Sequence, residues 1–127
     1  MSKSSNYIFS DYKFLFNTVP LFLDKPICSQ DLKTTYGVAL KEIAPINCSV
    51  NANPSRDLTF RWTFNSSSEL TTIEEGRFSQ SGTISSLNYI AYHERDYGTI
   101  LCWARNEQGE QEEPCVIHII PAGQKYH

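Results

Sequence analysis

The chain has 127 residues, of which 40% are hydrophobic and 20% charged, with four Cys. These figures describe one globular domain with a tail, and they exclude a two-domain enzyme. A domain of this size can bury a core without help, so no metal or cofactor is predicted. The net charge of -3 excludes a typical nucleic-acid-binding protein. No run approaches the roughly 20 apolar residues of a membrane span.

Residues 1–26 are rich in aromatic side chains but show neither strand alternation nor a helical stripe. Asp11, Lys13 and Asn17 interrupt the apolar stretch that a secretory signal needs, and no small-residue cleavage site follows. We therefore expect a tail or linker here, either the end of a preceding domain or an artefact of the gene model. A working signal peptide is the alternative. The predicted domain spans residues 27–121, and residues 122–127 form a C-terminal linker.

From residue 27 onward, short apolar alternations are separated by turn residues, a pattern typical of an all-β sandwich. Helical periodicity is absent, which excludes an enzyme fold of alternating strands and helices. The sequence predicts two antiparallel sheets whose strands include residues 46–50, 60–64, 87–89, 100–104 and 115–120.

Cys48, Trp62 and Cys102 have the order and spacing found in immunoglobulin domains. Facing sheets lie about 10 Å apart, a gap that one disulfide can bridge while the indole of Trp62 fills the core beside it. Six of seven positions resemble the immunoglobulin run D-x-G-x-Y-x-C-x-A-x-N-x-x-G: Asp96, Gly98, Cys102, Ala104, Asn106 and Gly109. The resemblance implies an immunoglobulin-like β-sandwich of the I-set or C2 type.

The seventh position is Ile100, where the family places a tyrosine that ties the corner before this strand to the backbone. We expect Ile100 to pack inward and the corner to be looser. Arg77 lies 19 residues before Asp96, a spacing that resembles the family's structural ion pair at the end of the sandwich.

Four cysteines allow three pairings, and the sequence alone does not choose among them. The resemblance implies a Cys48–Cys102 bond between the sheets, which leaves Cys28 to pair with Cys115. A small β domain with an even, paired set of cysteines belongs in an oxidising compartment, so an extracellular location is predicted.

The chain also resembles, over roughly residues 21–123, a membrane-proximal immunoglobulin domain of the arthropod sidestep family. The segments that carry this resemblance are 26–28 (PIC), 36–38 (YGV), 97–104 (YGTILCWA), 106–109 (NEQG) and 114–123 (PCVIHIIPAG). Members of that family are axon-guidance receptors of the plasma membrane with several immunoglobulin domains. They bind immunoglobulin-superfamily partners of the beaten-path family, and their outermost domain is expected to make the contact.

The resemblance thus implies a glycoprotein domain that takes part in cell adhesion, either in protein recognition or as a spacer between neighbouring domains of the parent receptor. The alternative is a secreted immunoglobulin-domain factor of immunity or signalling. An enzyme is not predicted. His93 has no activated nucleophile beside it, and Cys115 and His118 face opposite sides of a strand, so neither a catalytic nor a metal site is expected.

Two segments match the N-glycosylation pattern, at Asn65 and at Asn47. Asn65 is the better candidate because it lies in a predicted loop, whereas the Asn47 sequon has the predicted disulfide cysteine at its centre.

The alternation that turns Cys102 inward turns Trp103 and Arg105 outward, beside Arg61 on the next strand of the same sheet. Trp and Arg are enriched at interface hot spots, so these three residues form a candidate interface. The alternative is that a local side chain or a neighbouring domain covers Trp103. Four acids around Gly109 predict a solvated acidic turn: Glu107, Glu110, Glu112 and Glu113.

Overall fold

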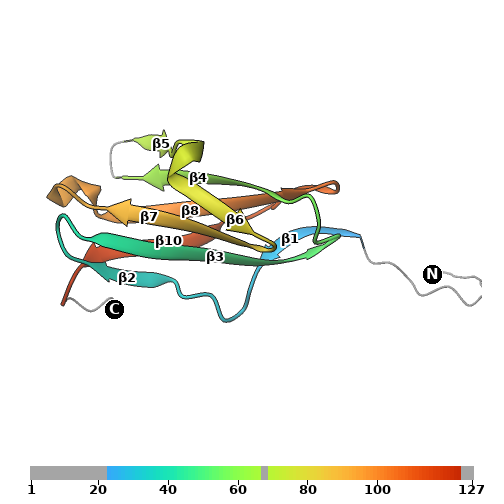
Figure 1. Cartoon of the computed structure of the whole chain (residues 1–127), viewed down its shortest axis with the longest axis horizontal. Coiled ribbons are helices and arrows are strands. Elements are labelled where there is room, and N and C mark those ends of the chain that lie inside the picture. The colour runs from blue at the N-terminus through green and yellow to red at the C-terminus, as the bar shows by residue number, and fades with distance from the viewer. Residues whose placement is uncertain (1–22, 67–68, 124–127) are drawn as a thin grey trace, which may run out of the picture.

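The computed structural model describes residues 23–66 and 69–123 (Figure 1). Most of the predicted tail and part of the predicted C-terminal linker lie outside these residues. The first strand begins at Asp24, three positions before the predicted start of the domain, and the domain boundaries stay a prediction. The strands are β1 (Asp24–Cys28), β2 (Thr35–Val38), β3 (Ile43–Asn53), β4 (Thr59–Asn65), β5 (Leu70–Thr72), β6 (Phe78–Ser81), β7 (Ile84–Ile90), β8 (Gly98–Asn106), β9 (Gly109–Glu110) and β10 (Cys115–Pro121).

The strands form the two facing layers of a sandwich (Figure 1). One sheet has the order β1-β3-β7-β6, and the other has the order β2-β10-β8-β4-β5, with β9 paired to β8. All pairs are antiparallel except β2 and β10, which run parallel. The predicted all-β fold is confirmed. The only helices of the described residues are the 3₁₀ turns η1 (Glu75–Arg77) and η2 (Glu94–Asp96), and neither could cross a membrane.

The core lies between the sheets and follows the alternation read from the sequence. Each inward position is buried while its neighbours along the strand face out, as at Ile46, Cys48 and Val50 of β3. Trp62 of β4 is fully buried, and its Nε1 donates a hydrogen bond to Ser85 Oγ at 2.9 Å. Ser85 Oγ in turn donates to the carbonyl of Ser79 at 3.0 Å, so the indole is linked to the opposite sheet by a satisfied polar chain.

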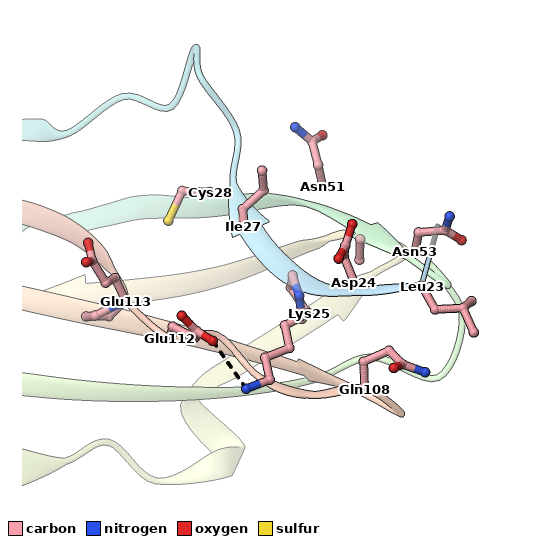
Figure 2. A pocket seen from close by; sticks show the side chains of 13 residues that line it. Leu23, Asp24, Lys25, Ile27, Cys28, Asn51, Asn53, Gln108, Glu112 and Glu113 are labelled. Carbon is pink, nitrogen blue, oxygen red and sulfur yellow. Dashed lines mark hydrogen bonds and ion pairs between the residues drawn. The ribbon is translucent and has the colours of Figure 1, made fainter. Parts of the chain in front are cut away.

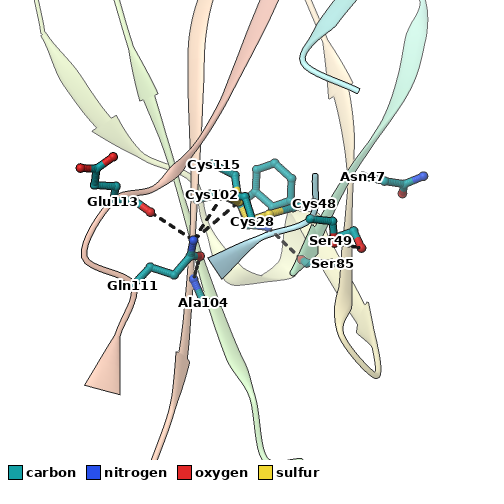
Figure 3. The surroundings of a disulfide bond; sticks show 12 residues. Cys28, Asn47, Cys48, Ser49, Ser85, Cys102, Ala104, Gln111, Glu113 and Cys115 are labelled. Carbon is teal, nitrogen blue, oxygen red and sulfur yellow. Dashed lines mark hydrogen bonds between the residues drawn. A yellow bond between two sulfur atoms is a disulfide. The ribbon is translucent and has the colours of Figure 1, made fainter. Parts of the chain in front are cut away.

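Two disulfides use all four cysteines (Figure 3). Cys48 of β3 bonds to Cys102 of β8 across the sandwich, and Cys28 of β1 bonds to Cys115 of β10. Both pairings are those that the resemblance to immunoglobulin domains implied. The first bond links the middles of the two sheets, and the second fixes the first strand to the start of the last.

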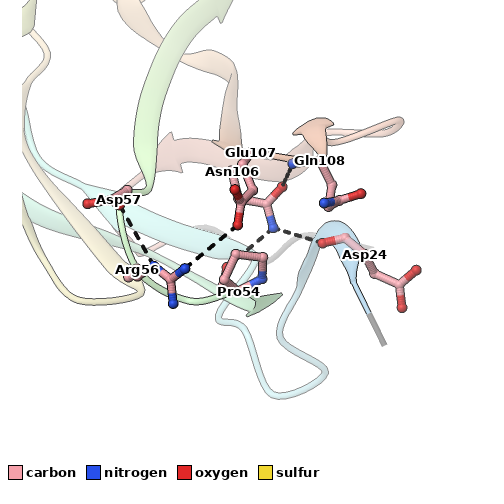
Figure 4. Close-up of polar contacts among 7 residues, drawn as sticks. All are labelled: Asp24, Pro54, Arg56, Asp57, Asn106, Glu107 and Gln108. Carbon is pink, nitrogen blue, oxygen red and sulfur yellow. Dashed lines mark hydrogen bonds and ion pairs between the residues drawn. The ribbon is translucent and has the colours of Figure 1, made fainter. Parts of the chain in front are cut away.

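Asn106, at the end of β8, holds the beginning of the domain in place (Figure 4). Its Nδ2 donates to the carbonyl oxygens of Asp24 at 2.8 Å and Pro54 at 3.3 Å, while its Oδ1 accepts the backbone N–H of Gln108. Gly109 completes the turn with a φ of +129°, a conformation that glycine adopts without strain. The Asn and Gly of the family run therefore have structural roles here.

The corner before β8 is held by tyrosines other than the one that Ile100 replaces. Ile100 is buried as predicted. Tyr89 Oη donates to the carbonyl of Asp96 at 2.6 Å, and Tyr97 Oη donates to the carbonyl of Val38 at 2.6 Å. These two hydrogen bonds fix the corner that was predicted to be looser.

The structure does not pair Arg77 with Asp96. Among the described residues, every ion pair found joins other partners. The carboxylate of Asp96 instead accepts the backbone N–H groups of Tyr92 and His93, at 2.9 and 3.0 Å, and caps η2. Because both local donors bond Oδ2, the residue keeps its place in the corner without Arg77.

Replacing Tyr89 by phenylalanine is expected to cost about 1–2 kcal/mol of unfolding free energy, the loss of one buried hydrogen bond. Burial, followed by the charge of Asp96, raises the pKa of Tyr89 to about 12, against the opposing charge of Arg77. Because the pKa of Tyr89 is higher in the folded state, the protonated phenol favours folding. This contribution is complete below about pH 10 and is lost as the pH rises to 12. Denaturant unfolding from pH 8 to 12 tests this, because the gap between wild type and Tyr89→Phe should narrow above about pH 10. A gap independent of pH would contradict it.

Candidate interaction face

Trp103, Arg105 and Arg61 lie together on the outer face of the sheet that contains β4, β8 and β10. The strand register places Arg61 directly opposite Trp103, with Arg105 two positions further along β8. Trp62 and Cys102, the neighbours of Arg61 and Trp103 along their strands, are fully buried on the inner face. The structure thus brings together the three residues predicted as a candidate interface.

Arg61 is fixed between two partners on this face. Its guanidinium lies over the ring of Trp103, 4.7 Å from the centroid. Its Nε and Nη2 donate to the two carboxylate oxygens of Glu110, at 3.1 and 2.9 Å. Such a two-point bond between a guanidinium and a carboxylate fixes orientation as well as distance. The indole therefore stands beside an arginine that is already ordered.

Glu110 was expected to belong to a solvated acidic turn, and the structure corrects this for one of the four acids. Glu107, Glu112 and Glu113 are exposed, whereas Glu110 is partly covered. The hydrogen bonds from Arg61 lower the pKa of Glu110, an effect that burial opposes and that the charges of Arg61 and Arg105 reinforce. Glu110 stays ionised and holds Arg61. The composition of this segment predicted only a solvated turn. The pairing of Glu110 with Arg61 could not be predicted, because it depends on β9 folding back beside β8.

Two polar atoms on the same face have no partner. Among the described residues, the buried side-chain atoms without a hydrogen bond are Trp103 Nε1 and Thr63 Oγ1. Thr63 is opposite Leu101 and diagonal to Trp103 in the β4–β8 pair. Buried polar groups are normally satisfied, so these two atoms are exceptions in the part of the face that local side chains cover, as Arg61 covers the ring of Trp103. Thr63 gave no signal in the sequence beyond its outward position.

Apolar side chains extend the face on both sides of Trp103. Val116 of β10 is opposite Leu101 and is 41% exposed, and Leu70 of β5 is 62% exposed. The centre of the face is therefore apolar and aromatic, while Arg105 and the Arg61–Glu110 pair lie towards its β9 end. Apolar centres with polar rims are the usual anatomy of protein interfaces.

Gln111 supports this region from the inside and was not recognised from the sequence (Figure 3). It is only 4% exposed, and its Oε1 accepts the backbone N–H of Ala104 at 2.7 Å while its own backbone N–H donates to Ala104 O. Its Nε2 donates to Glu113 O at 3.1 Å and contacts Cys28 Sγ at 3.4 Å. The side chain thus replaces the strand backbone missing between β9 and β10.

Replacing Gln111 by alanine is expected to cost about 1–3 kcal/mol, because the N–H of Ala104 loses its acceptor in a buried position. The Arg61–Glu110 pair next to it should loosen as well. Thermal unfolding measures the first effect. Amide exchange at Ala104 reports directly on the lost acceptor, and unchanged protection there would contradict the role given to Gln111.

The two sequon asparagines face solvent on different sheets. Asn65 is the last residue of β4 and is exposed, although it ends a strand and does not lie in a loop as predicted. Ser67 of its sequon lies outside the described residues. Asn47 is an outward residue of β3, exposed, and its Oδ1 accepts a hydrogen bond from Ser86 Oγ at 2.7 Å.

An open groove of about 880 Å³ runs beside β1 (Figure 2). Ile27 and Asn51 line it on one side and Glu112 on the other, and the exposed Lys25 Nζ reaches Glu112 at 3.5 Å. An exposed pair of this kind contributes little to stability. No cluster of His, Cys, Asp and Glu that could hold a metal ion occurs in residues 23–66 and 69–123.

Comparison with solved structures identifies the architecture. The chain is similar to the titin domain M4, with a TM-score of 0.60 and 17% identity over 80% of this chain and 100% of that one. It is similar to a Dscam structure described for isoform specificity, with a TM-score of 0.57 and 15% identity over 86% of this chain and 27% of that one. It is also similar to the heterodimer of the IG1 domains of ZIG-8 and RIG-5, with a TM-score of 0.53 and 21% identity over 72% of this chain and 83% of that one.

No protein-family model matches the chain, and no curated protein matches it in sequence. The structural similarities therefore define the fold and leave the finer family open. Together with the Cys48–Cys102 bond, the buried Trp62 and the two-sheet topology, they assign the chain to the immunoglobulin fold.

Proposed function

We propose that this domain recognises another protein outside the cell through the outer face of β4, β8 and β10. The observation that carries the proposal is an ordered group on this face, in which Arg61 lies over Trp103 and is bonded at two points to Glu110. Side chains ordered before binding lose little conformational freedom on docking. Trp and Arg in such a setting are the residue types that contribute most to binding energy.

The two disulfides support an extracellular location for this function. All four cysteines are bonded, which is typical of proteins that mature in the secretory pathway. We infer that the domain belongs to the ectodomain of a plasma-membrane adhesion or guidance receptor, with the residues before β1 and residues 122–127 as linkers to neighbouring domains. A secreted immunoglobulin-domain factor is the alternative.

The resemblance to the sidestep family suggests the class of partner. It favours an immunoglobulin-superfamily protein of the cell surface, of the beaten-path kind. Two of the similar structures are complexes between immunoglobulin domains, one of ZIG-8 with RIG-5 and one of titin M10 with obscurin-like 1. They support a protein partner for this fold. Catalysis is not part of the proposal.

Asn65 is proposed to carry a glycan at the Leu70 end of this face, away from the Arg61–Trp103 pair. It lies at the opposite end of β4 from the Arg61–Trp103 pair, four residues along the strand. Four residues of a strand span about 13 Å, which separates the two positions.

The proposal is tested with the full chain, secreted from insect cells, multimerised and applied to a panel of immunoglobulin-domain ectodomains that includes beaten-path proteins. Arg105→Glu reverses an exposed charge on the face without touching the core. It should weaken binding to any partner found by about tenfold or more. Trp103→Ser should weaken it further, by about thirtyfold or more.

Ile84→Ser on the opposite sheet is the matched control and should bind like wild type. Binding that survives both substitutions on the proposed face but is lost in Ile84→Ser would overturn the assignment. A domain that binds no member of the panel would instead favour the spacer role within the receptor.

A further inference from the structure

The outer face of β3, β7 and β6 carries no charged side chain. The positions that alternate with the buried residues of these three strands are all uncharged: Ile43, Pro45, Asn47, Ser49, Asn51, Asn53, Ile84, Ser86, Asn88, Ile90, Ser79 and Ser81. The opposite sheet, in contrast, presents Arg61, Arg105 and Glu110 on its outer face. The face is thus uncharged over these three strands in a chain whose residues are 20% charged, and the exposed Asp24 of β1 lies at its edge, opposite Asn53.

An uncharged outer sheet face lowers the solubility of a protein. Ile43 is 64% exposed and Ile84 is 42% exposed on it, and Ile27 of the neighbouring strand β1 is 63% exposed. Flat faces with exposed apolar side chains and no charges favour association between copies. Something other than charge is needed to keep this face in water.

A glycosylation sequon lies on this uncharged face. Asn47 is in the central strand pair, opposite Ser86, with Ile43 four residues before it and Ile84 opposite Ser49. Its Oδ1 is held by Ser86 Oγ, whereas its Nδ2 forms no hydrogen bond with the described residues. The Nδ2 is the atom to which a glycan is attached, and it faces solvent without a competing partner.

We propose that an N-linked glycan on Asn47 covers the outer face of β3, β7 and β6, and thereby closes it to other proteins. The inference rests on the passage through the secretory pathway that the proposed function requires. A bulky hydrated glycan supplies the solubility that charged side chains supply elsewhere. It also directs protein recognition to the opposite sheet, where Trp103 lies.

The modification is a transfer to the nascent chain from an oligosaccharide linked to a polyprenyl diphosphate. Asn47 Nδ2 attacks the anomeric carbon, so that a C–N bond forms and the bond from that carbon to the diphosphate oxygen breaks. The polyprenyl diphosphate leaves with the electron pair, and the nitrogen loses one proton to a base. Ser49 completes the sequon and, in the folded domain, its Oγ pairs with Ser29 Oγ at 2.9 Å.

The test uses the full chain secreted from insect cells behind an added signal peptide. Glycopeptide mass spectrometry should find Asn47 occupied. Sedimentation velocity should then show that Asn47→Gln associates at a concentration about tenfold lower than wild type does. Asn88→Gln, on the same face but outside any sequon, and Asn65→Gln, on the other sheet, are the matched controls and should behave like wild type.

Trimming the glycan of the folded wild-type protein to its first sugar with an endoglycosidase repeats the comparison without any effect on folding. It should also promote association, and Ile84→Lys should reverse the association of Asn47→Gln by returning a charge to the face. An Asn47 that is occupied but whose removal and trimming leave the protein monomeric would overturn the inference. So would a secreted, disulfide-bonded protein with Asn47 unoccupied, although that result leaves the proposed function standing. Four free thiols in the secreted chain would overturn both.

Discussion

Replacing Trp62 by alanine is expected to lower the unfolding free energy by about 3–5 kcal/mol, because a fully buried indole is removed and the core cannot close over the space. Since small domains are stable by only about 5–15 kcal/mol, this loss removes a large part of the stability. Ser85 Oγ also loses the donor that links it to Trp62. Denaturant titration followed by circular dichroism measures the loss.

Trp62→Phe separates packing from hydrogen bonding in the same experiment. Phenylalanine keeps most of the apolar volume, so its cost should be about 1–3 kcal/mol, mainly the lost hydrogen bond from the indole to Ser85. Equal losses for the two variants would show that packing of the indole contributes less than its hydrogen bond. An unaffected Trp62→Ala domain would contradict the position of Trp62 in the core.

Removing either disulfide by paired Cys→Ala substitution is expected to cost about 2–4 kcal/mol. The bonds join residues 54 and 87 positions apart, and the loop of one lies inside the loop of the other. Each remaining bond therefore still restricts the unfolded chain when the other is removed. The loss on removing both should exceed the sum of the two single losses. Thermal and denaturant unfolding of the three variants measure this.

A loss for the double removal that equals the sum of the single losses would contradict the chain-entropy account. It would favour local packing around each bond as the source of stability. Cys48 and Cys102 are fully buried, so their removal also leaves a small cavity, whereas Cys28 is partly exposed.

Local alternation was enough to predict the sandwich, because every strand that turns one face to the core repeats with a period of two. The alternation on either side of Cys48, Trp62 and Cys102 identified the inner faces of their strands correctly for the same reason. The disulfide pairing needed the family resemblance, since four cysteines are compatible with three pairings. Sequence alternation placed Trp103, Arg105 and Arg61 on one face, and the register of β4 and β8 then determined that they are adjacent.

The predictions that were wrong or missing concern contacts that residue spacing along the sequence does not specify. Arg77 and Asp96 are at the family's spacing, but Asp96 Oδ2 accepts local backbone N–H groups instead. Tyr89, on a different strand, makes the hydrogen bond that the absent tyrosine would make. The side chain of Gln111 accepts the hydrogen bond that a neighbouring strand would otherwise accept. Each of these depends on which residues lie side by side in three dimensions.

Site-specific photo-cross-linking tests most directly the claim that the β4–β8–β10 face is the recognition surface. A photoreactive phenylalanine derivative is placed at Val116 on the proposed face or at Ile84 on the opposite sheet, positions that are 41% and 42% exposed. With a partner found in the panel, irradiation should join the partner to the protein labelled at position 116 and leave the protein labelled at position 84 uncoupled. Cross-linking from position 84 but not from position 116 would contradict the account.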